Sequence, residues 1–218
     1  LTAAPDALAQ KLEEFRVRGV NVEVSYHALG AISYAQGEYD KALGLCDQSL
    51  RDRVQKYGDK HLQVAEAHSS IGRVYHALGE YAKALRHRED ALKIRLDKLG
   101  PQHQDVGTSF REVGEVLASR GKYDEGLEYY KKDLALEVMK LGERHVKVAR
   151  SYYAMGEVFV SKGSYDEAME YHEKSLSIKV EKLGAVHEDV AKSYLGLAGV
   201  HKARADYDTA LEDCQKCL

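Results

Sequence analysis

Apolar residues recur every three or four positions through two neighbouring stretches of this chain. In the stretch from about 64 to 78 they are Ala67, Ile71, Val74, Tyr75 and Leu78, and from about 81 to 99 they are Ala84, Leu85, Leu92 and Leu96. This spacing puts them on one face of a helix. Glycine follows each stretch, where a helix end favours a residue that adopts positive φ. The pattern therefore predicts two consecutive helices, ended by Gly79 and Gly100.

The same pattern returns every 42 residues along the chain. The recurring residues are Gly30, Gly72, Gly114 and Gly156; Gly37, Gly79, Gly121 and Gly163; Gly58, Gly100, Gly142 and Gly184; Tyr39, Tyr81, Tyr123, Tyr165 and Tyr207; His61, His103, His145 and His187; and Leu50, Leu92, Leu134, Leu176 and Leu218. Self-similarity at such a period is typical of helical repeat arrays. We expect one array over 1–218, with repeats at 22–57, 64–99, 106–141, 148–183 and 190–218.

The predicted fold class is all-α: a right-handed α-solenoid of antiparallel helix pairs, with about five repeats and a partial N-terminal helix. Leu8, Leu12 and Phe15 align with Leu50, Val54 and Tyr57, so residues 5–16 are expected to be the tail of a truncated repeat. The chain starts without methionine, which suggests an excised fragment. Repeat arrays need polar caps at their ends, so uncapped ends could stack on another copy.

Small residues recur inside both helices of the predicted pair. The glycine series that contains Gly72 falls within the first helix, at a cost of about 1 kcal/mol relative to alanine. Small residues on the second helix recur in parallel, at Ala42, Ala84, Gly126, Ala168 and Ala210. We interpret both series as places where the two paired helices approach closely.

These motifs resemble the tetratricopeptide repeat (TPR). The resemblance is carried by Tyr26, Leu29 and Gly30 with Gly37, Tyr39, Ala42 and Leu43, and by Tyr152, Met155 and Gly156 with Phe159, Gly163, Tyr165 and Ala168. The usual unit has about 34 residues. The additional residues extend the second helix and end in a Leu-Gly-x-x-His link, which is similar to the kinesin-light-chain and nephrocystin-type variant. The resemblance covers essentially the whole chain and implies a superhelix whose first helices line a concave, peptide-binding groove.

Composition narrows the possible partners. The net charge is −3 and the pI is near 6.4, whereas nucleic-acid binding usually needs a basic stripe. No stretch approaches the roughly 18 apolar residues of a membrane span, so neither nucleic acid nor membrane is an expected partner. Three cysteines do not form a disulfide framework, which favours reduced thiols and a cytoplasmic location.

The residues that could suggest a metal site or a catalytic site are better explained by roles in packing and in helix ends. Cys214 aligns with Cys46, Arg88 and His172 at a packing position between paired helices, and no second cysteine pair completes a zinc site. Successive members of the histidine series lie a whole repeat apart, so we expect each to pack or hydrogen-bond where a helix begins. His187-Glu188 lacks the second histidine of a zinc-protease motif, since residue 191 is alanine. Neither a phosphate-binding loop nor a triad spacing is present, so we expect no metal, no cofactor and no enzyme activity.

The charged run Arg86-His87-Arg88-Glu89-Asp90 lies on a second helix. We interpret it as a solvated outer face, with a secondary partner surface as the alternative.

The face of each first helix that lacks the packing pattern is the candidate binding surface. We call the following the predicted groove residues: Glu66, Ser69, Arg73 and His76; Thr108, Arg111 and Glu115; Arg150, Tyr153 and Glu157; and Lys192 and Leu195. Arginine holds carboxylates in bidentate fashion, and the aromatic and aliphatic members could form apolar subsites. An ordinary solvated surface is the alternative.

We expect a scaffold or adaptor that binds a peptide segment of a protein partner in this groove. The alternatives are a head-to-tail self-assembly element and a regulatory module of a larger protein. The chain has a single asparagine, Asn21, whereas the grooves of chaperone-binding and kinesin-light-chain repeats are asparagine-rich. The resemblance therefore implies the architecture and leaves the ligand open.

Overall fold

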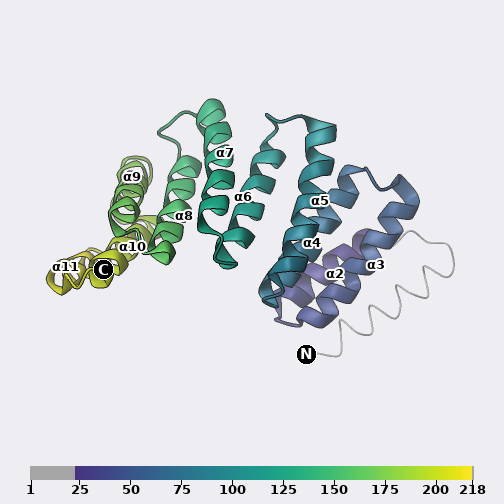
Figure 1. The fold of residues 1–218 in the computed structure, drawn as a ribbon, viewed down its shortest axis with the longest axis horizontal. Coiled ribbons are helices and arrows are strands. Elements are labelled where there is room, and N and C mark those ends of the chain that lie inside the picture. The colour runs from purple at the N-terminus through teal and green to yellow at the C-terminus, as the bar shows by residue number, and fades with distance from the viewer. Residues whose placement is uncertain (1–22, 218) are drawn as a thin grey trace. The chain divides into compact units, whose positions relative to one another are not determined.

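The computed structural model describes residues 23–217, and every regular element among them is an α-helix. The helices are α2 (Glu23–Ala35), α3 (Tyr39–Tyr57), α4 (Leu62–Ala77), α5 (Tyr81–Leu99), α6 (Gln104–Ser119), α7 (Tyr123–Leu141), α8 (Val146–Lys162), α9 (Tyr165–Leu183), α10 (Glu188–Ala203) and α11 (Tyr207–Gln215) (Figure 1). Residues 5–16, the predicted tail helix, lie outside the described residues. The prediction of an all-α class is confirmed.

The chain divides into two compact units, at residues 1–101 and 102–218. Within each unit, every helix packs against the next one in the sequence. First helices of neighbouring repeats also meet, α2 with α4 and α8 with α10. These are the contacts of antiparallel helix pairs stacked side by side. The prediction of one continuous array stays a prediction.

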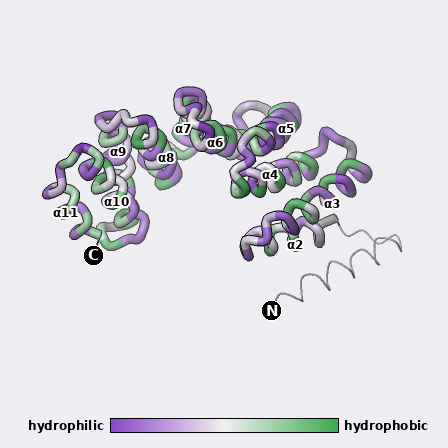
Figure 2. Tube along the Cα trace, turned by 60° about the horizontal axis from the view of Figure 1, so that its bottom comes forward, coloured by the Kyte–Doolittle hydropathy of each residue, from purple (hydrophilic) through white to green (hydrophobic). Residues whose placement is uncertain are grey.

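Each repeat buries its apolar stripe partly against the next repeat. In the first unit, Ala42 and Cys46 of α3 form a cluster with Ile71 and Val74 of α4. In the second unit, a cluster of the same kind joins α7 to α8 through Leu127, Tyr130, Met155 and Val158. Figure 2 shows hydrophobic positions recurring between hydrophilic ones along the helices. The repeating pattern in the sequence is thus a repeating interface in the fold.

Histidine caps four of the first helices. The Nδ1 atoms of His61, His103, His145 and His187 accept hydrogen bonds of 3.2, 3.1, 3.1 and 3.0 Å from the backbone N–H two residues later. These bonds satisfy donors that a helix N-terminus would otherwise leave without a partner. The prediction that these histidines act where a helix begins is confirmed.

Glycines of the Gly72 series allow the close helix contact that the sequence predicted. A Cβ built at Gly114 would lie 3.0 Å from the backbone oxygen of Gly126. At Gly72 it would lie 3.0 Å from Cδ of Arg88. Arg88 is buried, which corrects the interpretation of residues 86–90 as a solvated face at that one residue, whereas Arg86 and Glu89 are exposed as expected. The physical reason is the missing Cβ at Gly72, which leaves room for the methylene stem of Arg88.

The last repeat departs from this packing. Cys214 was predicted at a packing position like that of Cys46, but it is exposed. Cys46 is covered by Ile71 and Val74 of the following first helix, and the described residues hold no helix after α11 that could cover Cys214 in the same way. Asp213 is buried instead, and its carboxylate lies 2.9 Å from Nδ1 of His201 and 3.1 Å from Nζ of Lys216.

Ala205 occupies a backbone conformation that the other repeats give to glycine. Its φ is 62°, and Gly37, Gly79, Gly121 and Gly163 adopt 75–82° at the equivalent position. The bonds Ala205 N–H to Lys202 O and Asp206 N–H to His201 O reproduce those made around Gly79. The fifth repeat therefore keeps the same helix end at the cost of a left-handed alanine.

We expect Ala205→Gly to stabilise the chain by about 1 kcal/mol, because a left-handed non-glycine residue costs about 1–2 kcal/mol and glycine restores some unfolded-state entropy. Urea unfolding of the full chain measures the change. The reverse substitution, Gly163→Ala, should destabilise the equivalent helix end by a similar amount. Equal stabilities for Ala205→Gly and the wild type would contradict the strain.

Candidate functional site

In the first unit, the predicted groove residues on α4 are engaged with their neighbours. The Glu66 carboxylate lies 3.1 Å from Nη1 of Arg53 and 3.4 Å from Nε2 of His27. The Arg73 guanidinium lies 4.7 Å from the ring centroid of Tyr34, and the His76 ring lies 5.5 Å from that of Tyr81. Glu66 and Arg73 thus link α4 to the preceding repeat.

Ser69 does not belong on an open surface. Only 8% of the residue is exposed, so it offers a partner little surface. The packing face of α4 is wider than the sequence pattern indicated, because α4 packs on both α3 and α5 and contacts α2 as well.

In the second unit, several predicted groove residues form ion pairs between repeats or within one helix. The guanidinium of Arg150 lies 3.0 Å from the Asp189 carboxylate, and Nζ of Lys192 lies 2.6 Å from the Glu188 carboxylate. Glu115 is exposed, and Leu195 is 54% exposed. The Arg150–Asp189 and Lys192–Glu188 ion pairs are individually weak, since exposed ion pairs contribute about 0–1 kcal/mol to stability.

Tyr153 and Glu157 surround a buried imidazole on α9. His172 is fully buried; its Nε2 lies 3.3 Å from the Glu157 carboxylate, and its ring meets that of Tyr153 edge-on at 5.0 Å. Nζ of the buried Lys179 lies 4.7 Å from the Tyr153 ring and donates to Ser193 Oγ at 2.8 Å. Burial lowers the pKa of Lys179 to about 8. Tyr153 therefore mainly covers the buried side chains of His172 and Lys179, both from α9.

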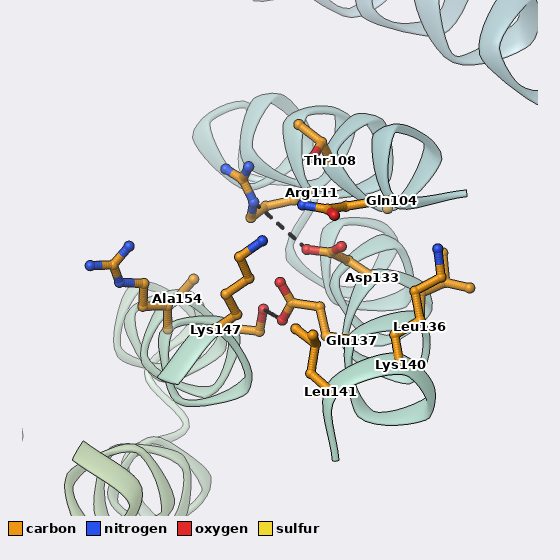
Figure 3. Close-up of a pocket in the computed structure, with 13 residues that line it drawn as sticks. Gln104, Thr108, Arg111, Asp133, Leu136, Glu137, Lys140, Leu141, Lys147 and Ala154 are labelled. Atoms are coloured by element: carbon orange, nitrogen blue, oxygen red, sulfur yellow. Dashed lines mark hydrogen bonds and ion pairs between the residues drawn. The ribbon is translucent and has the colours of Figure 1, made fainter. Parts of the chain in front are cut away.

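A pocket of about 410 Å³ lies among α6, α7 and α8 (Figure 3). Its lining includes three predicted groove residues, Thr108, Arg111 and Arg150. The other lining residues are Gln104, Gly107, Asp133, Leu136, Glu137, Lys140, Leu141, Lys147, Ser151 and Ala154. The remaining predicted groove residues of the second unit lie outside this lining.

Two acidic residues of α7 form the polar floor of the pocket. Asp133 is 3% exposed, and its Oδ2 lies 3.7 Å from Nε of Arg111, beyond hydrogen-bond length. Glu137, one turn later, accepts a hydrogen bond of 2.8 Å from Ser151 Oγ. Figure 3 shows both carboxylates and the Lys147 ammonium pointing into the same space.

Burial determines the ionisation of Asp133. Desolvation and the nearby charge of Glu137 raise the pKa of its carboxyl to about 7, and Arg111 and Lys147 oppose this shift. A group whose pKa is displaced this far in a pocket is a candidate for function.

The prediction from the sequence overlooked Asp133 and Glu137, although a signal was present. The positions equivalent to Asp133 hold Ser49, Ala91, Ser175 and Cys217, and those equivalent to Glu137 hold Arg53, Arg95 and Lys179. Acidic residues stand at both positions in the third repeat alone. A comparison among the repeats of this chain would have singled them out.

Other chemistry is not assembled in the part of the chain that the structure describes. Among residues 23–217, no three His, Cys, Asp or Glu side chains are placed to share a metal ion. The Cys217 thiol donates to the backbone oxygens of Ala191 and Asp213 at 3.4 and 3.3 Å. None of the described helices combines the length and apolar character that a membrane crossing requires.

Comparison with known families and structures agrees with the repeat pattern. A family model described as tetratricopeptide repeat matches residues 21–97 and 105–181. No curated protein matches the chain.

Three solved structures illustrate the similarity in fold. A Podosopora anserina protein described as a kinesin light chain with nearly identical TPR-like repeats is 21% identical, with a TM-score of 0.76 over 88% of this chain and 92% of that one. BtubC (BKLC) from P. vanneervenii is 21% identical, with a TM-score of 0.78 over 99% and 89%. The apo form of RapI is 18% identical, with a TM-score of 0.74 over 90% and 69%. At these identities the likeness concerns the fold, which is the solenoid of helix pairs that the sequence predicted.

Proposed function

Since this chain belongs to the tetratricopeptide repeat family, whose fold supports protein–protein interaction, we propose that it is a scaffold or adaptor that binds a peptide segment of a partner on its first helices. The main observation in support of this proposal is the pocket among α6, α7 and α8, where Arg111 and Arg150 lie beside an open, partly apolar space. Within each unit by itself, the proposed surface consists of that unit's predicted groove residues, other than Ser69.

The exposed cations of the second unit support this proposal. The side chains of Arg111 and Arg150 are 44% and 66% exposed, and their intramolecular partners hold them by long or exposed ion pairs. The Arg111 contact is too long for a hydrogen bond and the Arg150 pair is exposed, so each is weak and easily exchanged for a ligand's carboxylate. Arginine also forms two parallel hydrogen bonds to a carboxylate, which would orient an extended peptide.

We expect Arg111→Glu/Arg150→Glu to abolish capture of the partners that the wild-type chain retains from cell lysate. Reversing both charges removes the carboxylate contacts and adds repulsion. Mass spectrometry of the retained proteins measures the effect, and circular dichroism checks that the variant is folded.

The matched control is Lys131→Glu/Lys174→Glu, which reverses two exposed cations on the second helices α7 and α9 of the same unit. This variant should retain the partners. If partners survive the arginine reversals and are lost with the lysine reversals, binding occurs on the second helices and the proposed surface is wrong.

A further inference from the structure

The floor of the pocket presents a hydrogen-bond acceptor that the described part of the protein does not use. Oδ2 of Asp133 is buried and has no hydrogen-bond partner, and Nε of Arg111 lies 3.7 Å from it. A buried polar atom without a partner costs free energy comparable to a lost hydrogen bond. A donor entering the pocket would recover that loss.

The third repeat is specifically adapted to hold this carboxylate. Gly107 replaces the alanine of Ala65, Ala149 and Ala191, and a Cβ built there would lie 2.7 Å from Oδ1 of Asp133. Three departures from the repeat pattern, at residues 107, 133 and 137, therefore meet in one place. The other repeats form the same helix pair without them, so folding does not require the two acids.

The shape and charge of the pocket define the donor. Leu136, Leu141 and Ala154 offer apolar wall for a methylene stem. Two carboxylates one turn apart on α7 match the planar fork of a guanidinium, which makes bidentate hydrogen bonds to carboxylates. Four cations also line the pocket, Arg111, Lys140, Lys147 and Arg150. They disfavour further basic residues beside the inserted one and favour acidic neighbours.

We propose that the pocket receives one arginine side chain of the partner's bound segment, with its guanidinium held by Asp133 and Glu137 and with acidic residues of the segment on the surrounding cations. This inference rests on the proposed function and names the anchor residue of the same site. Arg111 moves from Asp133 to the acidic residue that follows the anchor.

A random peptide display library selected against the full chain provides the test. The wild type should enrich sequences with arginine at one fixed position and acidic residues next to it. The variant Asp133→Ser/Glu137→Arg restores residues found at these positions in the first repeat, Ser49 and Arg53, and should lose the arginine preference while still folding. Glu128→Gln, at an exposed residue of α7 that belongs neither to the pocket lining nor to the predicted groove residues, is the matched control and should keep it.

The strongest selected peptide then gives a direct measurement. Replacing its arginine by neutral, isosteric citrulline should weaken binding to the wild type about tenfold or more, since hydrogen bonds to charged groups are the stronger class. The same replacement should change binding to Asp133→Ser/Glu137→Arg less than about twofold. Carbon-13 resonances of the Asp133 carboxyl should show its pKa falling when the arginine peptide binds.

The outcomes separate the two proposals. Selected peptides without an arginine preference, whose binding is lost in Arg111→Glu/Arg150→Glu, would overturn the arginine pocket and leave the peptide surface in place. An arginine preference that persists in Asp133→Ser/Glu137→Arg would also overturn the pocket. Failure of the wild type to select any peptide would contradict both the arginine pocket and the peptide-binding surface.

Discussion

Replacing Asp133 by asparagine is expected to raise the free energy of unfolding of the second unit by about 2 kcal/mol at pH 8 and to change it little at pH 4. The substitution keeps the shape of the side chain and removes the charge that burial disfavours. The groups facing the carboxyl are Glu137 on its own helix, Arg111 on α6 and Lys147 on α8.

The direction follows from proton linkage. The pKa of Asp133 is about 7 in the folded chain and about 3.9 for an unperturbed aspartate. The folded state therefore binds the proton more tightly, and the stability that this provides is complete below pH 4 and is lost as the pH rises through 7. Each tenfold difference in proton affinity between the folded and unfolded chain corresponds to about 1.4 kcal/mol, and solvent in the pocket reduces the total to about 2 kcal/mol.

Urea unfolding at pH 4, 6 and 8, with hydrogen exchange to assign the change to α6, α7 and α8, measures the effect. Asp124→Asn, an exposed change on the same helix, is the control and should alter stability by less than about 0.5 kcal/mol. If Asp133→Asn follows the pH profile of the wild type, the carboxyl is solvated and the strain assigned to the pocket does not exist. A gain at pH 8 would mean that the wild type retains a destabilising residue, as binding sites commonly do.

Gly156→Ala is expected to destabilise the second unit by about 1 kcal/mol, even though alanine is the better helix former. An added Cβ would lie 2.8 Å from Cε1 of His172. The ring has no room to retreat, because it is fully buried and a Cβ at Gly196 on its other side would lie 2.9 Å away. Overpacking of about 1–3 kcal/mol outweighs the helix preference of about 1 kcal/mol.

The matched control is Gly199→Ala, at a helical glycine of α10 where an added Cβ meets nothing within 4 Å. It should stabilise the chain by about 0.5–1 kcal/mol. Combining Gly156→Ala with His172→Ala should cost less than the sum of the single changes, because the smaller side chain frees the space. Thermal and urea unfolding of the four variants completes the cycle, and stabilisation by Gly156→Ala would refute the packing role of this glycine.

Much of the fold could be predicted because its determinants are local and repeated. The prediction of a helix at about 81–99 agrees with α5 (Tyr81–Leu99) because Gly79 and Gly100 adopt positive φ beside its two ends. Repetition strengthens each signal, since one interface recurs along the chain. The prediction was wrong at Cys214, because burial at this position depends on a following first helix, as Ile71 and Val74 provide for Cys46, and the described residues hold none after α11.

The sequence by itself determined the helix pairs, their period, their ends and the family, because these depend on residues within a few turns of one another. Only the tertiary structure decided which charges meet. Arg150 pairs with Asp189 and Arg111 approaches Asp133, residues separated by 39 and 22 positions. Burial of Ser69, Arg88 and Asp133 likewise depends on the side chains of neighbouring helices. The ionisation of a side chain and its access to solvent depend on these neighbouring helices, so the pocket could be identified only from the tertiary structure.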